Sequence, residues 1–365
     1  MPSTIVGTND PKTVKRWSGQ LAVDYEVKSY FTKRFIGMDD NAVIQRKDDL
    51  ESDAGDKISF DLSVQLRNRP VSGDDRVTGN EENLRFFSDE VYIDQLRKRV
   101  SAGGKMTRKR ILHDLRKVAN ARLSEYWAKY LDELMFIYLS GARGINEDFA
   151  EPTTYAGHAG NPIQAPDTTH IMYGGIATSK ASLANTDTMT RAVVERVGVK
   201  TKMIRSLDPE NACMMPVDVE GEKHFILLMT PFQTHQLKND ATAGGWLDVQ
   251  KAAAAAEGRK NPIFKGALGM MGDIVLHEHR NVIRFNDYGA GSNVSAARAL
   301  CLGRQAGVVA YGTPGGLRYS WFEEDMDAGN EPTVTAGVIF GFKKARFNSR
   351  DFGVIAVDTF APNPG

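Results

Sequence analysis

The sequence predicts an α+β protein in which a projecting hairpin and a long helix precede a mixed body. Three observations predict this class. Residues 58–66 alternate apolar and polar side chains, as a half-buried strand does. Residues 107–140 repeat apolar side chains every three or four positions, as an amphipathic helix does. From about residue 216, strand-like and helix-like segments are mixed without the regular alternation of a doubly wound parallel sheet.

Composition limits the classes of protein to consider. The chain has 365 residues, of which 41% are hydrophobic and 25% charged, and its 46 basic residues equal its 46 acidic ones, which gives no reason to expect tight sequence-independent binding to nucleic acid. No apolar run suggests a membrane span or a secretory signal, so we expect cytoplasmic synthesis. Cys213 and Cys301 stand in apolar surroundings and predict buried thiols, not a disulfide framework.

The first element with a clear pattern is the hairpin. About fifty mixed, polar residues precede it and predict an arm that has no core of its own. The alternating strand begins at Ile58, and a second strand-like run covers residues 84–93. Between them, residues 67–83 are rich in Gly, Pro and charge. A structureless connection this long is usually functional or disordered, and an isolated ribbon is only marginally stable, so we expect the hairpin to lean on a neighbour.

One long helix is predicted next, over residues 107–140, with Thr107 as its N-cap and Gly141 as its stop. At 1.5 Å per residue it would be about 50 Å long. Residues 142–180 predict a loop or insertion, and a shorter helix at 188–197 is capped by Asp187. The second half predicts, in order, a strand at 225–229, a helix opening near Pro231, an Ala-rich helix at 246–257, strands at 274–276 and 282–285, a helical segment at 294–306, and strands at 334–342 and 352–357.

This order of parts is similar to that of the tailed-bacteriophage major capsid (coat) proteins with the Hong Kong 97-type fold. The segments that carry the resemblance are Gly79–Arg110, His224–Asp240, Asn261–Val282, Ala297–Gly312 and Phe347–Thr359. The resemblance implies an N-terminal arm (1–56), an extended loop hairpin (57–98), a peripheral domain (99–215) with a spine helix at 107–140 and an insertion near 142–180, an axial domain (216–312), and return strands of the peripheral domain with the C-terminus (313–365).

The resemblance also implies a function and partners. The chain would assemble as hexamers and pentamers into an icosahedral head shell in the virion, around double-stranded DNA held by weak non-specific contacts. Too little chain precedes the hairpin for a built-in scaffold, so a separate scaffolding protein is expected, with assembly in the host cytoplasm. A portal protein is a further expected partner, and a decoration protein is left open. No enzymatic activity, cofactor or metal is expected.

Two sets of charged residues are candidate contact sites. The hairpin tip carries both signs of charge, which suits contact with an adjacent subunit, although a mobile solvated loop is the plain alternative. Its residues are Arg67, Arg69, Asp74, Asp75, Arg76, Glu81 and Glu82. A basic stretch could face DNA or a scaffolding protein, although a solvated helix face is the plainer explanation, because charge runs usually are solvated. Its residues are Arg97, Lys98, Arg99, Lys105, Arg108, Lys109, Arg110, Arg116 and Lys117.

Other chemistry in the sequence is weak. His277 and His279 could share one strand face and bind a metal, but their spacing is not that of zinc proteases. No phosphate-binding loop or nucleophile elbow is present. The acidic run Glu323–Asp327 predicts a solvated face. The alternatives to a capsid protein are an encapsulin-type compartment shell and, in a different class, a metal-dependent enzyme using the two histidines.

Overall fold

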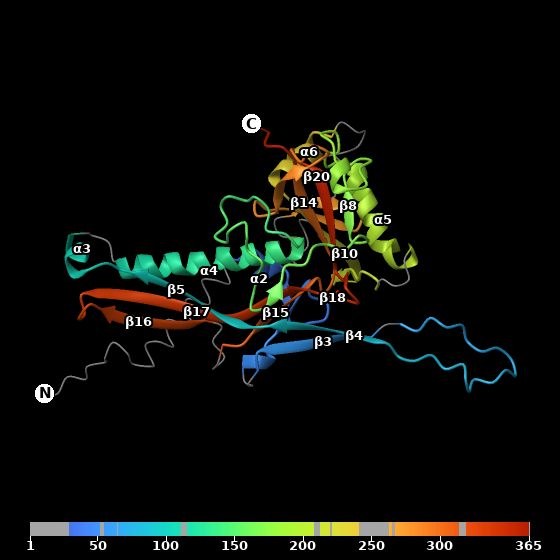
Figure 1. The fold of residues 1–365 in the computed structure, drawn as a ribbon, viewed down its shortest axis with the longest axis horizontal. Helices are drawn as coiled ribbons and strands as arrows, with labels where there is room; N and C mark the ends of the chain where they lie inside the picture. Colours follow the sequence, from blue (N-terminus) through green and yellow to red (C-terminus); the bar gives the residue numbers. More distant parts are fainter. Residues whose placement is uncertain are drawn as a thin grey trace.

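The extended loop and the long helix α4 project from a body made of two sheets in the computed structural model (Figure 1). The structure describes residues 29–51, 55–63, 65–110, 115–207, 212–219, 221–240, 263–264, 267–313 and 319–364. Within these ranges, no helix is long and apolar enough to span a membrane. The predicted Ala-rich helix at 246–257 lies outside the described residues.

The predicted hairpin is confirmed. Strands β3 (Lys57–Ser63) and β4 (Phe86–Tyr92) pair antiparallel, from Lys57 opposite Tyr92 to Ser63 opposite Phe86. The pairing stops three residues before Leu66, where the apolar alternation ends, and the loop that follows projects away from the body (Figure 1). At the root of the hairpin, Ile58 and Val91 pack on Val308 and Ala310, so the chain's own body supports the base of the ribbon.

A six-stranded sheet continues from the hairpin. Its long strand β17 pairs with β5 along one edge. Along the other edge, its first half pairs with β16 and its second half with β15. The strands are β1 (Ile36–Gly37), β2 (Ile44–Lys47), β15 (Gly307–Tyr311), β17 (Glu331–Lys344), β16 (Ser320–Met326) and β5 (Asp94–Ser101). The turn η1 (Asp49–Glu51) follows β2, and the short helix α2 (Tyr30–Arg34) precedes β1. Phe31 and Phe35 are buried in the main core, so the described part of the segment 1–56 lies on the body.

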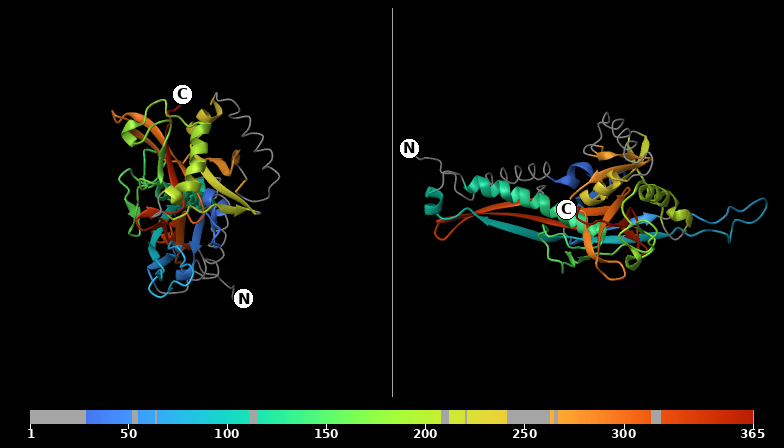
Figure 2. Two further views of the ribbon diagram at one scale, coloured as in Figure 1. Left: turned by 90° about the vertical axis from the view of Figure 1, so that its right-hand side faces the viewer. Right: turned by 90° about the horizontal axis from the view of Figure 1, so that it is seen from above.

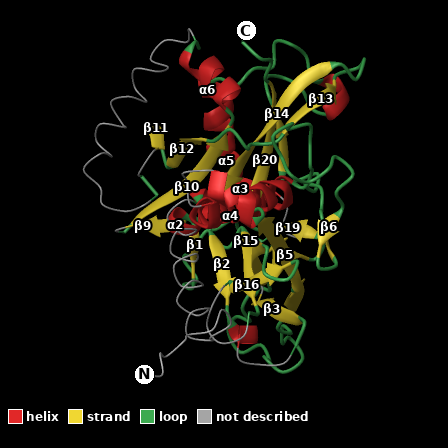
Figure 3. Ribbon diagram, turned by 90° about the vertical axis from the view of Figure 1, so that its left-hand side faces the viewer, coloured by secondary structure: helices red, strands yellow, loops and turns green. Residues whose placement is uncertain are grey.

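The long helix begins later than its pattern predicts. The structure has a short helix α3 (Lys105–Arg110) and then α4 (Leu115–Ser140), with residues 111–114 outside the described part. The predicted N-cap, Thr107, therefore lies inside α3. The predicted end is confirmed: Gly141 has a φ of +68°, and a Cβ there would lie 2.1 Å from the Gln164 carbonyl oxygen. Seen end-on, α4 lies between the two sheets (Figure 3).

An eight-stranded sheet forms the rest of the body. Helices α5 (Arg191–Leu207) and α6 (Pro231–Lys238) flank it, and Val193, Val194 and Val197 of α5 pack on its strands. Figure 2 shows this part from two further sides. The strands, in spatial order, are β11 (Ala267–Met271), β12 (Ile274–Glu278), β10 (Glu222–Met229), β14 (Val294–Leu302), β20 (Val354–Phe360) and β8 (Ile171–Tyr173), with β13 (Arg284–Tyr288) on β14 and β9 (Val217–Val219) on β10.

Two local predictions are wrong. Residues 294–306 are not helical, because the segment pairs as β14 with β10 on one side and β20 on the other. Its alanines favour a helix locally, but tertiary pairing in the core overrides that propensity. Asp187 does not cap α5: its carboxylate accepts a hydrogen bond from the Ala184 amide (2.8 Å), and Thr190 accepts from the Val193 amide instead. Helix α5 also extends ten residues beyond the predicted end at Val197.

The remaining elements follow their patterns closely. The strands predicted at 225–229, 274–276 and 334–342 lie within β10, β12 and β17, and α6 begins at Pro231 behind a Thr230 cap. Strands β13 and β20 each begin two residues later than predicted. The region 142–180 is mostly irregular. The short elements not yet named are β6 (Gly157–His158), β7 (Asn161–Pro162), η2 (Lys180–Ser182), β18 (Arg346–Phe347) and β19 (Arg350–Asp351).

Three connections join the two sheets: one runs from β5 through α4 to β8, and the other two lie side by side. Of these two crossings, one runs from β14 to β15 and the other from β17 to β20, so β15 lies in the six-stranded sheet and β20 in the eight-stranded sheet. The Gly303 amide of the first crossing donates to the Gly353 carbonyl of the second (2.8 Å). A Cβ at Gly353 would lie 2.7 Å from Ala306 Cα. The two crossings therefore touch.

A buried charge cluster joins the eight-stranded sheet to the end of α4. Arg298 on β14 donates to both carboxylate oxygens of Asp358 on β20, at 2.7 and 2.8 Å, and to the Ser140 carbonyl oxygen at 2.9 Å. The Tyr288 hydroxyl donates to Asp358 at 2.7 Å and accepts from Arg298. Arg298 is 7% exposed and Asp358 1%. Such a pair is tolerated in a core because its hydrogen-bonding groups are satisfied.

Candidate assembly interface

Glu82 ties the two arms of the extended loop together at their base. Its carboxylate accepts hydrogen bonds from the backbone amides of Arg67 and Asn68, each at 2.8 Å. Those hydrogen bonds hold the pKa of Glu82 below its usual range, because they stabilise the ionised form. The sequence singled out Glu82 as a contact residue, and the structure gives it a role inside the loop.

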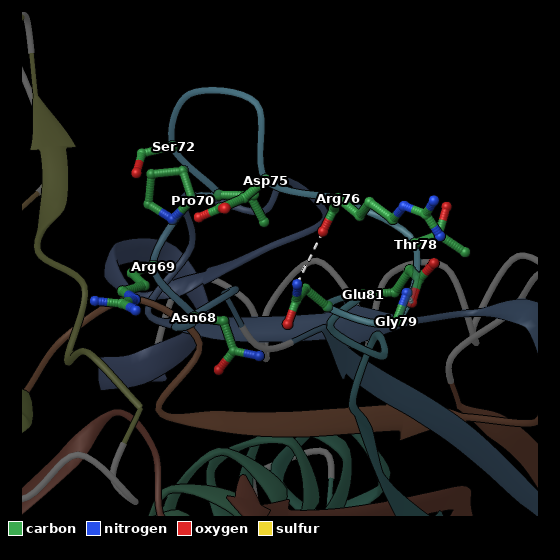
Figure 4. A pocket seen from close by; sticks show the side chains of 11 residues that line it. Asn68, Arg69, Pro70, Ser72, Asp75, Arg76, Thr78, Gly79 and Glu81 are labelled. Carbon is green, nitrogen blue, oxygen red and sulfur yellow. Dashed lines mark hydrogen bonds between the residues drawn. The ribbon is translucent and has the colours of Figure 1, made fainter.

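Further hydrogen bonds shape the tip, which curves around a polar hollow (Figure 4). The Asn80 side-chain amide donates to the Arg76 carbonyl at 2.9 Å, and the Gly79 amide donates to Glu81 at 2.7 Å. Gly79 has a φ of +96°, which favours glycine at this turn. Asp74 and Asp75, like Arg69 and Arg76, are exposed and make no ion pair within the part of the chain that the structure describes.

The loop also presents apolar side chains, which the charge-based reading of the sequence missed. Leu66, Val77, Leu84 and Phe86 are each at least 60% exposed. Single exposed apolar residues are common, but four on one projecting loop mark a surface that another molecule can cover. The signal was present in the sequence as apolar residues scattered through a polar segment.

The predicted basic stretch is divided among three elements. Arg97, Lys98 and Arg99 lie on β5, and the rest lie on α3 and the start of α4. Arg99 pairs with Glu324 (2.7 Å), and Arg116 pairs with Glu323. The Lys98 ammonium lies 4.7 Å from the centre of the Tyr126 ring. The acidic run on β16 is therefore not a plain solvated face, because two of its carboxylates pair with the basic stretch.

Helix α3 carries the exposed remainder of the basic stretch. Arg108 donates to the Asn330 carbonyl oxygen at 3.2 Å. Lys105, Lys109 and Arg110 are exposed and have no acidic partner among the described residues. These three cations form the part of the stretch that is available to a polyanion or an acidic protein.

The sheet formed by β5, β17 and β16 has one face under α4 and presents exposed side chains on the other. Val334, Ala336 and Val338 point into the core beneath α4. Because neighbouring residues of a strand alternate in direction, the cross-strand register places Arg97, Arg99, Phe322 and Met326 on the opposite face. Phe322 is 50% exposed and Met326 40%. We call this exposed side, which carries Arg97, Arg99, Phe322 and Met326, the outer face of the sheet.

The two histidines of the metal alternative have protein partners. The ring nitrogens of His277 lie 2.7 Å from the Ile263 carbonyl oxygen and 3.2 Å from the Tyr30 hydroxyl. His279 stacks on Phe136, and its Nδ1 accepts from the Asn281 amide. Burial lowers the pKa of each histidine to about 4. The described residues contain no group of three potential metal ligands.

Comparison with known proteins identifies the architecture. The family described as "Phage capsid protein" matches residues 5–363. The chain belongs to the phage capsid protein family. The capsid of Ralstonia phage GP4 shares 62% identity with this capsid protein, with a TM-score of 0.87 over 100% of both chains. The major capsid protein of Pseudomonas phage KPP25 is 28% identical, covering 96% of this chain and 95% of its own.

More distant structures confirm the fold. The capsid of cyanophage Pam1 is 24% identical and has a TM-score of 0.70 over 92% of both chains. The capsid protein thus has the predicted α+β, Hong Kong 97-type fold, and it is a major capsid protein that forms the shell of a phage. The family match supports the phage capsid protein among the alternatives that the sequence left open.

Proposed function

We propose that the capsid protein assembles as hexamers and pentamers of an icosahedral shell in which the extended loop of one copy lies on the outer face of the β5–β17–β16 sheet of the next. The observation that carries this proposal is the pair of exposed apolar surfaces at opposite ends of the subunit. Val77 and Leu84 lie on the loop, and Phe322 and Met326 lie on the sheet. A contact between unlike surfaces repeats around a ring and closes it.

The charges on the two surfaces support the same pairing. Arg69 and Arg76 of the loop have no acidic partner within the described chain, and Glu324, which pairs with Arg99, lies exposed on the outer face. Conversely, the loop carboxylates Asp74 and Asp75 can meet Arg97 on the sheet. Such complementary pairs fix register and partner choice more than they add affinity.

The proposal is tested by introducing a charge on each surface separately. Val77→Asp and Phe322→Asp should each abolish closed particles when the protein is expressed with its scaffolding protein and examined by sedimentation and negative-stain microscopy. Both side chains are exposed in the subunit, so the thermal midpoint of the unassembled protein should stay within about 2 °C of wild type. Met38→Asp, at a residue 61% exposed but on neither surface, is the matched control. Normal particles from both test variants would refute the proposal.

A charge exchange tests whether the two surfaces meet each other. Asp75→Arg and Arg97→Asp should each lower particle yield, and the double variant should recover it, because the exchanged charges restore attraction across the contact. Additive losses in the double variant would show that the two residues belong to different contacts.

We also propose that the exposed cations of α3 face packaged double-stranded DNA or a separate scaffolding protein. Lys109→Glu with Arg110→Glu should weaken binding of the unassembled protein to one of these partners at low salt, and the difference should shrink as salt rises. Lys33→Glu with Lys223→Glu, at exposed lysines outside the basic stretch, is the matched control. Equal binding of both double variants to both partners would remove the proposal.

We also propose domain assignments, a place of assembly and a further partner, all of which follow from the resemblance to Hong Kong 97-type capsid proteins. The six-stranded sheet with α3 and α4 corresponds to the peripheral domain, and the eight-stranded sheet with α5 and α6 corresponds to the axial domain. These bounds differ from the ones expected from the sequence, because α5, β8 and β20 then belong to the axial domain and β15 to the peripheral domain. Assembly takes place in the host cytoplasm, with a portal protein at one vertex, and the protein acts as a building unit without catalysis. Electron microscopy of particles from cells that express the capsid, scaffolding and portal proteins tests these assignments together.

A further inference from the structure

Helix α5 carries an apolar stripe on the side that faces away from the core. Its inner side chains, including Val193 and Val197, are buried against the eight-stranded sheet. Val199 and Met203 lie one turn apart on the outer side and are 64% and 43% exposed. A β-branched residue lowers helix propensity, and in an isolated subunit Val199 gains no burial in return. The two residues therefore suit a contact that the isolated subunit does not make.

A rigid turn beside α5 presents a third apolar side chain. Ile176 is 95% exposed. The turn that holds it is closed by a hydrogen bond from the Ala177 amide to the Gly174 carbonyl (3.1 Å). A Cβ at Gly175 would lie 2.0 Å from Asp187 Oδ1, so the turn is packed tightly on the body. Ile176 is thus held out from the surface on a fixed support.

Side chains of α5 occupy the open edge of the eight-stranded sheet. Strand β8 is the edge strand, paired to β20 on one side. Lys200 donates to the Ile171 carbonyl oxygen at 2.7 Å, and Arg196 donates to the Tyr173 carbonyl oxygen at 3.2 Å and to that of Gly175. With these carbonyls engaged, the edge is not open to addition of another strand. A partner on this side has to make its contact through side chains.

This side of the body is continuous with the extended loop. The Arg205 guanidinium, in the last turn of α5, donates to the Gln65 side chain at the foot of the loop. Helix α5 and the loop lie on the same side of the molecule, to the right in Figure 1 and toward the viewer in the left view of Figure 2. A second copy that lies against the loop on this side therefore also meets α5.

We propose that Ile176, Val199 and Met203 form a contact ridge that packs against the adjacent copy of this chain in the shell. This proposal rests on the proposed function, because the partner of the ridge is the copy that the loop contacts. The contribution of the ridge is separate: the loop contact ties the periphery of one subunit to the next, and the ridge holds the eight-stranded sheets of the two copies in register. The stripe on α5 and the turn at Ile176 act as one surface because Arg196 bridges them.

Chemical labelling of a cysteine at position 199 tests the ridge directly. Cys301 is fully buried, and burial raises the pKa of its thiol to about 12, so it does not react with maleimide under native conditions. In a Cys213→Ser background, Val199→Cys should react rapidly in the unassembled protein and at least about ten-fold more slowly in particles. Lys223→Cys, at an exposed residue on β10, is the control for reagent access and should change less than about two-fold. Equal rates at position 199 in both states would overturn the proposal.

A double substitution in the ridge tests this proposal independently of the proposed function. Ile176→Asp with Val199→Glu should lower particle yield at least about ten-fold, while the melting temperature of the unassembled protein stays at the wild-type value. If wild type forms particles and this variant forms them equally well, the ridge is wrong and the proposed function stands. If the wild-type protein itself forms no particles with its scaffolding protein, the proposed function fails. The scaffolding protein can also be added alone, before shells form. If Val199→Cys already reacts slowly under that condition, the surface contacts the scaffolding protein, and the proposed contact with an adjacent copy is wrong.

Discussion

Arg298→Met removes the guanidinium that links the eight-stranded sheet to the end of α4, and the expected result is a large loss of stability. The substitution leaves the Asp358 carboxylate buried, with only the Tyr288 hydroxyl of the cluster to bind it, and it leaves the Ser140 carbonyl without this donor. Methionine fills much of the space of the arginine stem, so the loss comes from the uncompensated charge and not from a cavity.

The expected magnitude follows from the burial of both partners. Removing one member of a buried ion pair typically costs about 3–5 kcal/mol, and exposures of 7% for Arg298 and 1% for Asp358 place this pair in that class. Urea unfolding followed by tryptophan fluorescence, under conditions that keep the protein unassembled, measures the free energy of unfolding. Arg298→Met with Asp358→Leu should cost less than the single substitution, about 1–2 kcal/mol, because no charge remains buried.

A matched exposed pair supplies the control. Arg122 pairs with Glu125 on the surface of α4, so Arg122→Met should change the free energy of unfolding far less than Arg298→Met does. If Arg298→Met is no more destabilising than Arg122→Met, or if the double variant at positions 298 and 358 is less stable than the single one, the reasoning from burial is refuted.

Three further predictions concern other parts of the subunit. Burial raises the pKa of Asp132 to about 6, above the ~3.9 of an unfolded aspartate, so its contribution to stability is full below about pH 4 and is lost as the pH rises through 6. The free energy of unfolding of wild type relative to Asp132→Asn should fall by on the order of 3 kcal/mol between about pH 4 and pH 7, and parallel pH profiles would contradict this. Glu82→Gln should speed amide hydrogen exchange at Arg67 and Asn68 without changing the melting temperature, whereas unchanged exchange would show that the carboxylate does not order the loop. Arg116→Glu should cost about 0.5–1 kcal/mol, and adding Glu323→Arg should recover at least half of it in urea unfolding; no recovery would mean that the two side chains do not pair.

Local patterns predicted the elements that have at least one stretch with a single buried face. The alternation from Ile58 predicted β3, and the three-to-four spacing predicted α4, whose first half buries one side while residues 130–140 are buried on all sides. The segment at 294–306 was misassigned because its alanines suit either structure, and only the pairing of β14 with two other strands decides between them. Such a decision depends on residues far away in the sequence.

The same limit applies to the charged residues. The distribution of charge along the chain identified a basic stretch and an acidic run, but not that Arg99 meets Glu324, 225 positions further along the sequence. The loop residues were predicted to contact an adjacent subunit, and the structure shows only that side chains such as Arg69 and Asp75 are exposed. What they contact stays a prediction, because an intersubunit contact depends on a second copy.

The paired crossings between the two sheets have a mechanical consequence. The two connections run side by side, in contact near Gly303 and Gly353, and tie the two sheets together at that point. Side chains of both sheets, such as Leu300 and Phe340, also share one core around α4, so the sheets resist rotation against each other. A subunit strained by its neighbours would therefore move as one rigid block, and differences in curvature between positions on a particle would have to arise at the contacts between copies.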